Sequence, residues 1–253
     1  REKIVAKLSD KGLVTKTEEN YLHQIATAER TGETIEPQIM RQWFVMVNKS
    51  FERNGKQVTL KSLMQEAVRG GGVTILPERF EKTYFHWIDN LRDWCISRQI
   101  WYGHRIPVWY RGEEVYCGIE APEGADWVQD PDTLDTWFSS GLWTFSTLGW
   151  GSDEAKWTKE KIYHPNTLME TGYDILFPWV ARMILMSTYL LSEIPFKTVY
   201  LHGLIRDGEG RKMSKSLDNA INPLEIIELY GADALRLALL SGNTPGNDAR
   251  LSD

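Results

Sequence analysis

The sequence predicts an α/β fold, because it contains two strand-like runs and the first of them leads into a long helix. Residues 165–170 suggest a buried strand that passes through a tight turn at 171–174 into a helix over 175–191. Residues 196–201, rich in apolar and β-branched side chains, form the next strand. With 253 residues, 42% of them hydrophobic and 25% charged, the chain can bury a substantial core in one large domain or two smaller ones.

Composition and charge exclude several classes of protein. The net charge of −6 argues against nucleic-acid binding through bulk charge, although a local basic patch remains open. Cys95 and Cys117 are too few and too far apart for a disulfide framework or a structural zinc site, so we expect reduced cysteines and a cytoplasmic location. Pro178 and Arg182 interrupt the longest apolar stretch, which argues against a membrane partner. The chain begins with arginine and no signal-like stretch follows, so we interpret it as a piece of a longer protein.

The elements before residue 131 follow from local patterns. A short amphipathic helix lies within residues 1–14, and Gly12 is placed to stop it. Apolar residues recur every three or four positions from Phe85 to Cys95, which predicts a helical face. The other expected elements are a strand within 35–45, a helix over 60–68, a strand over 73–76, a hairpin of 106–110 with 114–117, and a surface connection over 118–132.

The later part of the chain is expected to contain a linker and two further helices. Residues 153–161 form a charged linker. The helix over 223–230 has Pro223 at its first position and Gly231 at its close, and 232–240 is a second helix.

The stretch from His202 to Ser216 is typical of a mobile loop that handles phosphates. It follows a strand, contains Gly208 and Gly210, and ends in a cluster of cations and hydroxyls. Glycine lets the backbone approach a ligand, and ammonium groups act as point charges on phosphate oxygens. Charge and glycine content alone are equally consistent with a basic surface turn.

The string Lys212-Met-Ser-Lys-Ser216 resembles the signature loop of the class I aminoacyl-tRNA synthetases. The sequence around it is similar to that of the valyl-tRNA synthetases over nearly the whole chain, notably in residues 93–99, 103–107 and 135–140. Ser139 stands where the isoleucine enzymes carry an aspartate.

The resemblance implies the C-terminal half of a Rossmann-type class I synthetase catalytic domain, with a small mixed α/β insertion and the start of a helical stem-contact subdomain. The implied ranges are 1–44 for the return from an editing insertion, 45–130 for a connective insertion, 131–220 for the catalytic half with the signature loop, and 221–253 for the stem-contact helices.

The resemblance also assigns an adenylation site. Lys215 is our first choice for the contact with the α- and β-phosphates and Lys212 the second, with Ser214 and Ser216 orienting the loop. The implied ATP and adenylate contacts add Met213, Gly172, Asp174, His202 and Gly203. From its position alone, Asp174 is equally a helix N-cap.

The amino-acid pocket is implied to consist of Trp137, Ile175 and Trp179. Recognition of valine by such a pocket rests on packing, where one methylene is worth about 1–3 kcal/mol, so isoleucine must be excluded sterically. From local sequence alone, Trp137 is equally a core residue. Arg98 and Arg105, interleaved with aromatic residues, are implied to face tRNA.

The implied reaction joins valine to ATP, accompanied by Mg²⁺, with loss of pyrophosphate, and then transfers the valyl group to tRNA(Val). The family's other signature, His-x-Gly-His, is not found in these residues. We therefore expect the partners of this chain to include the missing N-terminal half of the catalytic domain and an editing domain, and the chain alone to be inactive. A non-catalytic tRNA-binding or assembly module and a synthetase for isoleucine remain alternatives.

One departure from the family is Asp218, which stands where a glycine is usual and is expected either to cap the next helix or to slow closure of the loop.

Overall fold

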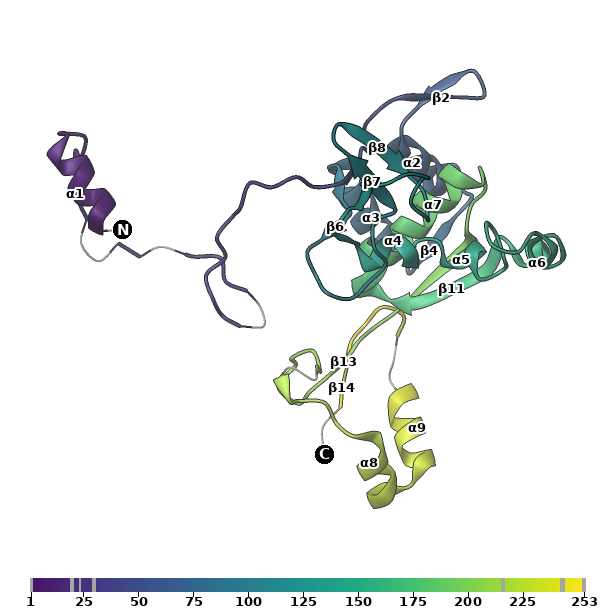
Figure 1. The fold of residues 1–253 in the computed structure, drawn as a ribbon. Helices are drawn as coiled ribbons and strands as arrows, with labels where there is room; N and C mark the ends of the chain where they lie inside the picture. Colours follow the sequence, from purple (N-terminus) through teal and green to yellow (C-terminus); the bar gives the residue numbers. More distant parts are fainter. Residues whose placement is uncertain are drawn as a thin grey trace. The chain divides into compact units, whose positions relative to one another are not determined.

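The chain was described from a computed structural model (Figure 1), which covers residues 2–18, 21–22, 24–28, 31–214, 217–241 and 244–251. It divides into two compact units, Arg1–Met40 and Arg41–Asp253. The first unit contains α1 (Glu2–Asp10), which buries none of its side chains. Gly12 follows with a φ of +65° and donates from its N–H to the carbonyl oxygen of Ser9, which confirms the predicted helix and its stop.

A parallel sheet forms the centre of the second unit, in the order β11 (Asn166–Gly172), β12 (Phe196–His202) and β4 (Thr74–Leu76). All three strands were predicted. Phe196, Val199 and Leu201 are fully buried, because the strand is covered on its faces as parallel strands usually are. Since the strands are parallel, their carboxyl ends lie at one edge of the sheet, where α/β folds place their ligands.

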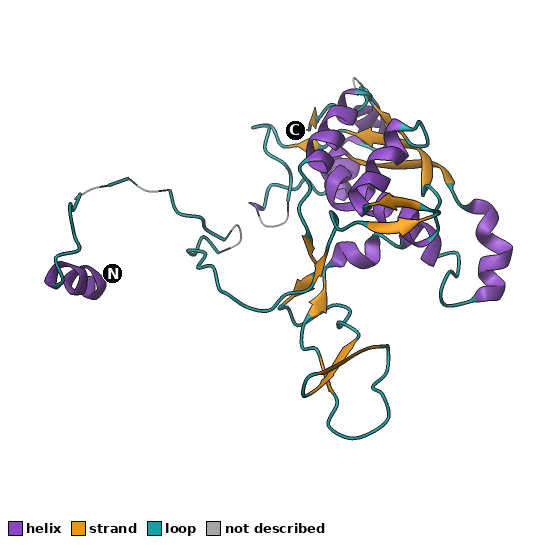
Figure 2. Ribbon diagram, turned by 90° about the horizontal axis from the view of Figure 1, so that it is seen from above, coloured by secondary structure: helices purple, strands orange, loops and turns teal. Residues whose placement is uncertain are grey.

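Helices cover this sheet, as Figure 2 shows for the second unit. α2 (Leu60–Arg69) begins with a capping box in which Thr59 and Ser62 satisfy each other's backbone N–H groups, which stabilises the helix by about 1 kcal/mol. α2 packs against α7 (Ala181–Leu190), and the core between them includes Met64 and Ile184.

The helix predicted through Cys95 is shorter than expected. α3 (Arg79–Asp89) ends before Asn90, and Trp94–Cys95 is instead β5, which pairs antiparallel with β1 (Phe44–Val45). Asp93 explains the change, because its carboxylate accepts a hydrogen bond from the distant N–H of Val47 at 3.0 Å. The strand predicted within 35–45 is likewise limited to the two residues of β1.

The chain between β1 and α4 also forms small antiparallel sheets. The predicted hairpin is confirmed as β7 (Val108–Arg111) with β8 (Glu114–Cys117). The connection predicted over 118–132 contains a further strand, β9 (Val128–Gln129), which pairs with β7. The remaining strands are β2 (Phe51–Arg53) with β3 (Lys56–Val58), and β6 (Ser97–Arg98) with β10 (Thr133–Leu134).

Short helices connect β10 to β11: α4 (Thr136–Ser140), α5 (Trp143–Ser146), α6 (Glu154–Glu160) and the 3₁₀ turn η1 (Lys161–Tyr163). The charged linker predicted over 153–161 is therefore wrong. Asp153 caps α6 by accepting from the N–H of Lys156 at 2.9 Å, a signal that was present in the sequence.

The long helix predicted over 175–191 is divided into three parts. The 3₁₀ turn η2 (Tyr173–Ile175) leads into the π-helical turn η3 (Leu176–Val180) and then into α7. Pro178 explains the irregular start, because its nitrogen cannot donate to the preceding turn.

After β12 the chain forms β13 (Ile205–Arg206), the helical hairpin α8 (Pro223–Tyr230) and α9 (Ala232–Leu240), and β14 (Ala249–Arg250), which returns parallel to β13. Both helices were predicted, and Asn222 caps the first by accepting from the N–H of Leu224. Figure 1 shows α8 beside α9. Within the described ranges, no helix has the length and apolar character needed to cross a membrane.

Candidate functional site

Two predicted ligand-binding residues meet at the carboxyl edge of the sheet. Gly172 at the end of β11 is the register partner of His202 at the end of β12. A Cβ on Gly172 would lie 2.7 Å from Oδ1 of Asp174, so a side chain there would displace the Asp174 carboxylate. The imidazole of His202 donates from Nδ1 to the carbonyl oxygen of Gly203 at 2.7 Å. The edge at which α/β folds bind ligands thus brings together Gly172, Asp174, His202 and Gly203.

Asp174 connects this edge to the signature loop. Its Oδ2 accepts a hydrogen bond from Nζ of Lys212 at 2.6 Å, across 38 residues of sequence. The first residues of η2 and η3 are capped by no side chain, so Asp174 does not serve as an N-cap here. The structure therefore brings the residue predicted to bind the ribose into direct contact with a residue predicted to bind phosphate.

The described part of the signature loop is a tight turn. Arg206 forms a β-bridge with Lys212, and Gly210 between them has a φ of +83°, which favours glycine. Met213 and Ser214 continue the loop, with the N–H of Ser214 donating to Oδ1 of Asn219 at 2.9 Å. Lys215 and Ser216 lie outside the described residues, so their roles stay predictions.

Asp207 and Asn219 hold this turn, and neither residue was predicted from the sequence. Asp207 is buried and accepts from both the N–H and Nε of Arg211 at 2.8 Å. Nδ2 of Asn219 donates to Oδ2 of Asp207 at 2.8 Å and to the carbonyl oxygen of Lys212 at 3.3 Å. The two side chains join the base of the loop to its far end.

Replacing Asn219 with alanine is expected to raise the pKa of Asp207. The hydrogen bond from Asn219 is the largest cause of its low pKa, with the N–H and guanidinium of Arg211 adding to it, and together they lower the pKa from 3.8 to about 2. Because the folded pKa is depressed, this contact favours the ordered loop at pH values above 3.8 and the benefit is lost as the pH falls toward 2. Carboxyl-carbon NMR titration measures the shift. Asn222→Ala, which removes only the cap of α8, should leave the pKa of Asp207 unchanged, and an equal shift in both variants would contradict the assignment.

Asp218 has a φ of +50°, in the left-handed region that favours glycine. This explains why glycine suits the position. The expectation that Asp218 caps the following helix is wrong, because α8 is capped by Asn222.

Two of the implied pocket residues lie on elements that pack together. Trp137 is half-buried on α4, and Trp179 is half-buried on η3. Nε1 of Trp179 donates to the carbonyl oxygen of Ser140 at the end of α4, at 3.0 Å. Ile175, also half-buried, ends η2 four residues before Trp179. Both tryptophans line the edge of the core rather than its centre.

Asp135 caps the start of α4, and Arg98 forms an ion pair with its carboxylate. The buried carboxylate of Asp135 accepts from Nε1 of Trp94 at 3.0 Å and forms an ion pair with Arg98 at 2.9 Å. Arg105 is also engaged within the chain, donating to the carbonyl oxygens of Asp130 and Gln129. These contacts give both arginines an internal structural role, and their predicted contact with tRNA stays a prediction.

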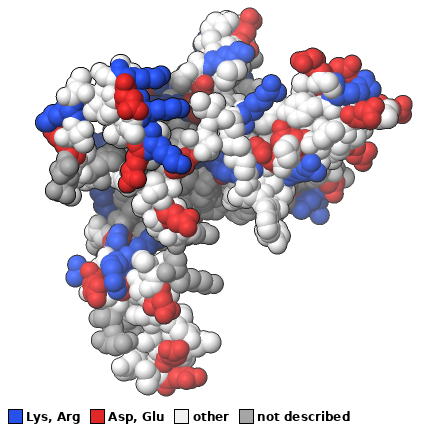
Figure 3. Space-filling model, turned by 60° about the vertical axis from the view of Figure 1, so that its left-hand side comes forward, with Lys and Arg blue, Asp and Glu red and all other residues white. Residues whose placement is uncertain are grey.

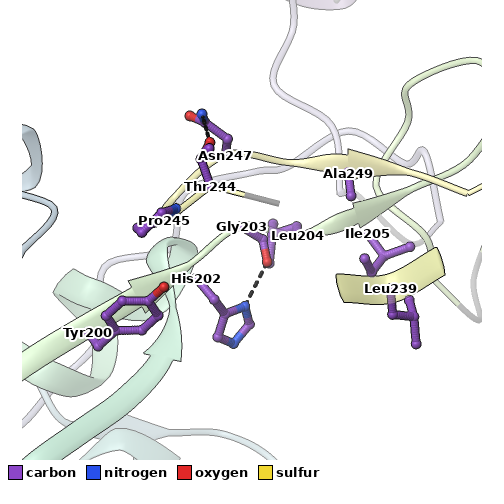
Figure 4. Close-up of a pocket in the computed structure, with 10 residues that line it drawn as sticks. All are labelled: Tyr200, His202, Gly203, Leu204, Ile205, Leu239, Thr244, Pro245, Asn247 and Ala249. Carbon is purple, nitrogen blue, oxygen red and sulfur yellow. Dashed lines mark hydrogen bonds between the residues drawn. The ribbon is translucent and has the colours of Figure 1, made fainter. Parts of the chain in front are cut away.

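A cavity of about 310 Å³ opens beside the end of β12 (Figure 4). Residues 200–205 form one wall, and Leu239 with the segment 244–249 forms the other. The two walls approach so closely that a Cβ on Gly203 would lie 1.7 Å from the carbonyl oxygen of Asn247. The cavity adjoins His202, at the same edge of the sheet as Asp174.

The family model for class I tRNA synthetases of the I, L, M and V group matches residues 2–129 and 121–252. The chain belongs to the class I tRNA synthetases. Its relatives include the valine–tRNA ligases of Bacillus licheniformis, 49% identical over 100% of this chain, of Bacillus subtilis, 48% identical over 100%, and of Dehalococcoides mccartyi, 49% identical over 99%. The predicted resemblance to the valyl-tRNA synthetases is thereby confirmed. The chain spans about 28% of the length of these relatives.

Solved class I synthetases share the fold. Apo methionyl-tRNA synthetase of Mycobacterium tuberculosis superposes with a TM-score of 0.56 at 18% identity, covering 90% of this chain and 38% of that protein. The LeuRS of Agrobacterium radiobacter K84, solved in a ternary complex with tRNA and LeuAMS, gives 0.52 at 24% identity, covering 64% and 26%. These matches confirm the predicted α/β catalytic fold of a class I synthetase. The predicted domain ranges stay predictions.

Within the ranges that the structure describes, no group of three or more His, Cys, Asp or Glu side chains is arranged to hold a metal ion. Whether the chain binds zinc therefore stays a matter of prediction.

Proposed function

We propose that the complete protein is a valine–tRNA ligase, which activates valine with ATP and transfers it to tRNA(Val). Membership of the class I family and the identity of 48–49% to valine–tRNA ligases support this activity. Because this chain spans about 28% of those relatives, the activity belongs to the whole protein. We place it in the cytoplasm, as expected for a ligase of this family.

The contact between Lys212 and Asp174 carries the proposal. In adenylate formation the carboxylate of valine attacks the α-phosphorus and pyrophosphate leaves, so the protein needs to supply position and positive charge rather than a nucleophile. Lys212 and Lys215 are the cations that we assign to the phosphates of ATP, which enters with Mg²⁺ as substrate. Asp174 is the acceptor that we assign to the ribose hydroxyls. A cationic loop that lies beside the carboxylate assigned to the ribose is suited to supply both position and charge.

Nucleotide binding must break this ion pair. The side chains of Lys212 and Asp174 are 56% and 30% exposed, and an ion pair this accessible to water contributes only about 0–1 kcal/mol. The ribose can therefore displace Lys212 at small cost, and the released ammonium group becomes available to the phosphates. The ion pair thus holds the loop near its place of action without closing the site.

We assign the side chain of valine to the space beside Trp137, Ile175 and Trp179. The hydrogen bond from Trp179 to Ser140 fixes the orientation of its indole ring, which holds this part of the wall in place. A rigid apolar wall selects by size, which suits a substrate without a polar side chain.

Binding of tRNA by bulk charge has little support. On the face drawn in Figure 3, lysine and arginine side chains alternate with aspartate and glutamate. The mixed charge agrees with the net charge of −6 and favours contacts at particular groups over a continuous basic surface.

Valine-dependent exchange of pyrophosphate into ATP tests the proposal. We expect exchange with the complete protein and almost none with the 253-residue chain alone, because the chain lacks a His-x-Gly-His string. Exchange with isoleucine or leucine but not with valine would contradict the substrate assignment. Binding of tRNA without exchange for any of the three amino acids would favour a non-catalytic tRNA-binding module.

A further inference from the structure

Asp248 lies in the segment between α9 and β14, and its carboxylate contacts groups from two elements of the candidate site. Oδ1 accepts from the N–H of Leu204 at 2.8 Å. Oδ2 accepts from the hydroxyl of Tyr173 at 2.9 Å and forms an ion pair with Nε of Arg206. Tyr173 lies between Gly172 and Asp174, and Arg206 lies at the base of the signature loop. A single carboxylate thus joins the loop to the turn at residues 171–174 (the βα turn).

Arg206 extends these contacts into the loop itself. One of its terminal nitrogens donates to the carbonyl oxygen of Gly210 at 3.2 Å, and the other donates to the hydroxyl of Tyr173 at 3.2 Å. The side chains of Arg206 and Asp248 are 30% and 23% exposed, so the ion pair is partly shielded from water. Loss of the carboxylate would leave the guanidinium without its charged partner and the loop without a fixed base.

The segment that carries Asp248 is also held from the side of α3. Arg79 donates to the carbonyl oxygen of Pro245 at 2.9 Å and to Oδ1 of Asn247 at 2.8 Å. Phe80 stacks on the ring of Tyr173, with centroids 5.4 Å apart and planes 16° apart. The turn at 244–248 is therefore fixed on both sides, and Asp248 has a defined position from which to act.

The backbone beside Asp248 adds a third constraint. Ala249 is the register partner of Ile205, and the N–H of Ala249 donates to the carbonyl oxygen of Leu204 at 3.0 Å. Figure 4 shows Gly203 and Leu204 facing the segment that carries Asn247 and Ala249. The close approach at Gly203 leaves little freedom for this pair of segments to shift.

We propose that Asp248 is a positioning residue for adenylate formation, which sets the βα turn with Asp174 and the signature loop with Lys212 relative to each other. The proposal rests on the proposed function for its effect on rate. Asp248 acts through Tyr173 and Arg206. Because a misplacement of about 1 Å can cost about 100-fold in rate, a change at Asp248 affects catalysis without any contact to substrate.

Asp248→Asn in the complete protein is expected to lower kcat for pyrophosphate exchange by about 10- to 100-fold. The valine KM should change by less than about threefold, since Asp248 contacts none of the three residues assigned to the valine pocket. Asp233→Asn is the matched control, because Asp233 is 96% exposed and forms an ion pair with Arg236 at the surface, and it should change neither constant. An equal loss in kcat and in valine affinity would overturn the proposal.

Trypsin cleavage after Arg211 and Lys212, followed by mass spectrometry, tests the coupling without relying on activity. We expect Asp248→Asn to accelerate cleavage at these sites and Asp233→Asn to have no effect. Unchanged cleavage would overturn the proposal even if the protein were active. Faster cleavage in a protein that shows no valine-dependent exchange would support the coupling while contradicting the proposed function.

Tyr173→Phe keeps the test valid if Asp248→Asn fails to fold. The variant removes one hydroxyl group and retains the stack on Phe80. It should lower kcat in the same direction by a smaller factor, with the melting temperature nearly unchanged. Where Asp248→Asn folds, the double variant should lose less activity than the product of the two single effects, because both substitutions remove contacts of the same network. Fully multiplicative effects would overturn the proposal.

Discussion

Lys215→Ala in the complete protein is expected to slow formation of valyl-adenylate by about 100- to 1000-fold, the usual cost of removing one group that stabilises charge in a transition state. Its ammonium group is assigned to the α- and β-phosphates, where negative charge grows as pyrophosphate leaves. Valine binding should change little, because the assigned pocket is formed by Trp137, Ile175 and Trp179. Pyrophosphate exchange measures the rate, and equilibrium dialysis with valine measures binding.

Lys159→Ala is the matched control for this prediction. Lys159 is exposed in the last turn of α6, so its replacement removes the same charge far from the signature loop in sequence. It should leave both the exchange rate and valine binding unchanged. Equal losses of adenylation rate and valine affinity in Lys215→Ala would contradict the assignment, because a group that acts mainly in the transition state lowers kcat.

Local sequence was sufficient where the signal for an element lies within the element. β12 was predicted because its residues are rich in apolar and β-branched side chains. α8 was predicted because Pro223 and Gly231 mark its two ends. α6 was missed although Asp153 is a typical N-cap, because the many charged residues were interpreted as a linker.

Tertiary contacts decided the cases that local sequence could not. Trp94 and Cys95 continue the helical spacing of α3, and the spacing alone predicts helix. The hydrogen bond from Val47 to Asp93, across 46 residues, and pairing with β1 favour a strand instead. Such overrides are expected where a partner distant in sequence supplies the hydrogen bonds.

In the candidate site, too, some residues have a local sequence signal and others depend on tertiary contacts. Gly172, Asp174, His202 and Gly203 were assigned to the nucleotide by the family resemblance, and they follow strands whose ends are visible in the sequence. The hydroxyl of Tyr173 and the carboxylate of Asp248 are 75 residues apart, and no local pattern connects them. Asp207 and Asn219 lie only 12 residues apart, but their contact depends on how the loop folds back on itself. The groups assigned to ligand were thus visible in the sequence, and the groups that position them required the structure.

Asp174→Asn is expected to remove the preference of the complete protein for ATP over its deoxy analogues. The substitution has two effects: it releases Lys212 and it removes the charged acceptor assigned to the ribose. The first is worth about 0–1 kcal/mol because the ion pair is exposed, whereas a hydrogen bond to a charged group contributes about 1.5–3 kcal/mol. The second effect therefore dominates, and kcat/KM for ATP should fall by about 10- to 100-fold.

Comparison of ATP with 2′-deoxy-ATP and 3′-deoxy-ATP in pyrophosphate exchange isolates the ribose contact. The unmodified protein should discriminate against at least one deoxy analogue by about 10-fold or more, and Asp174→Asn should reduce this ratio to about twofold. Glu209→Gln is the control, because it removes an exposed negative charge from the same loop without touching Asp174. It should retain the full preference for ATP. If Asp174→Asn also retained that preference, the ribose assignment would be wrong, and the carboxylate would serve only to anchor Lys212.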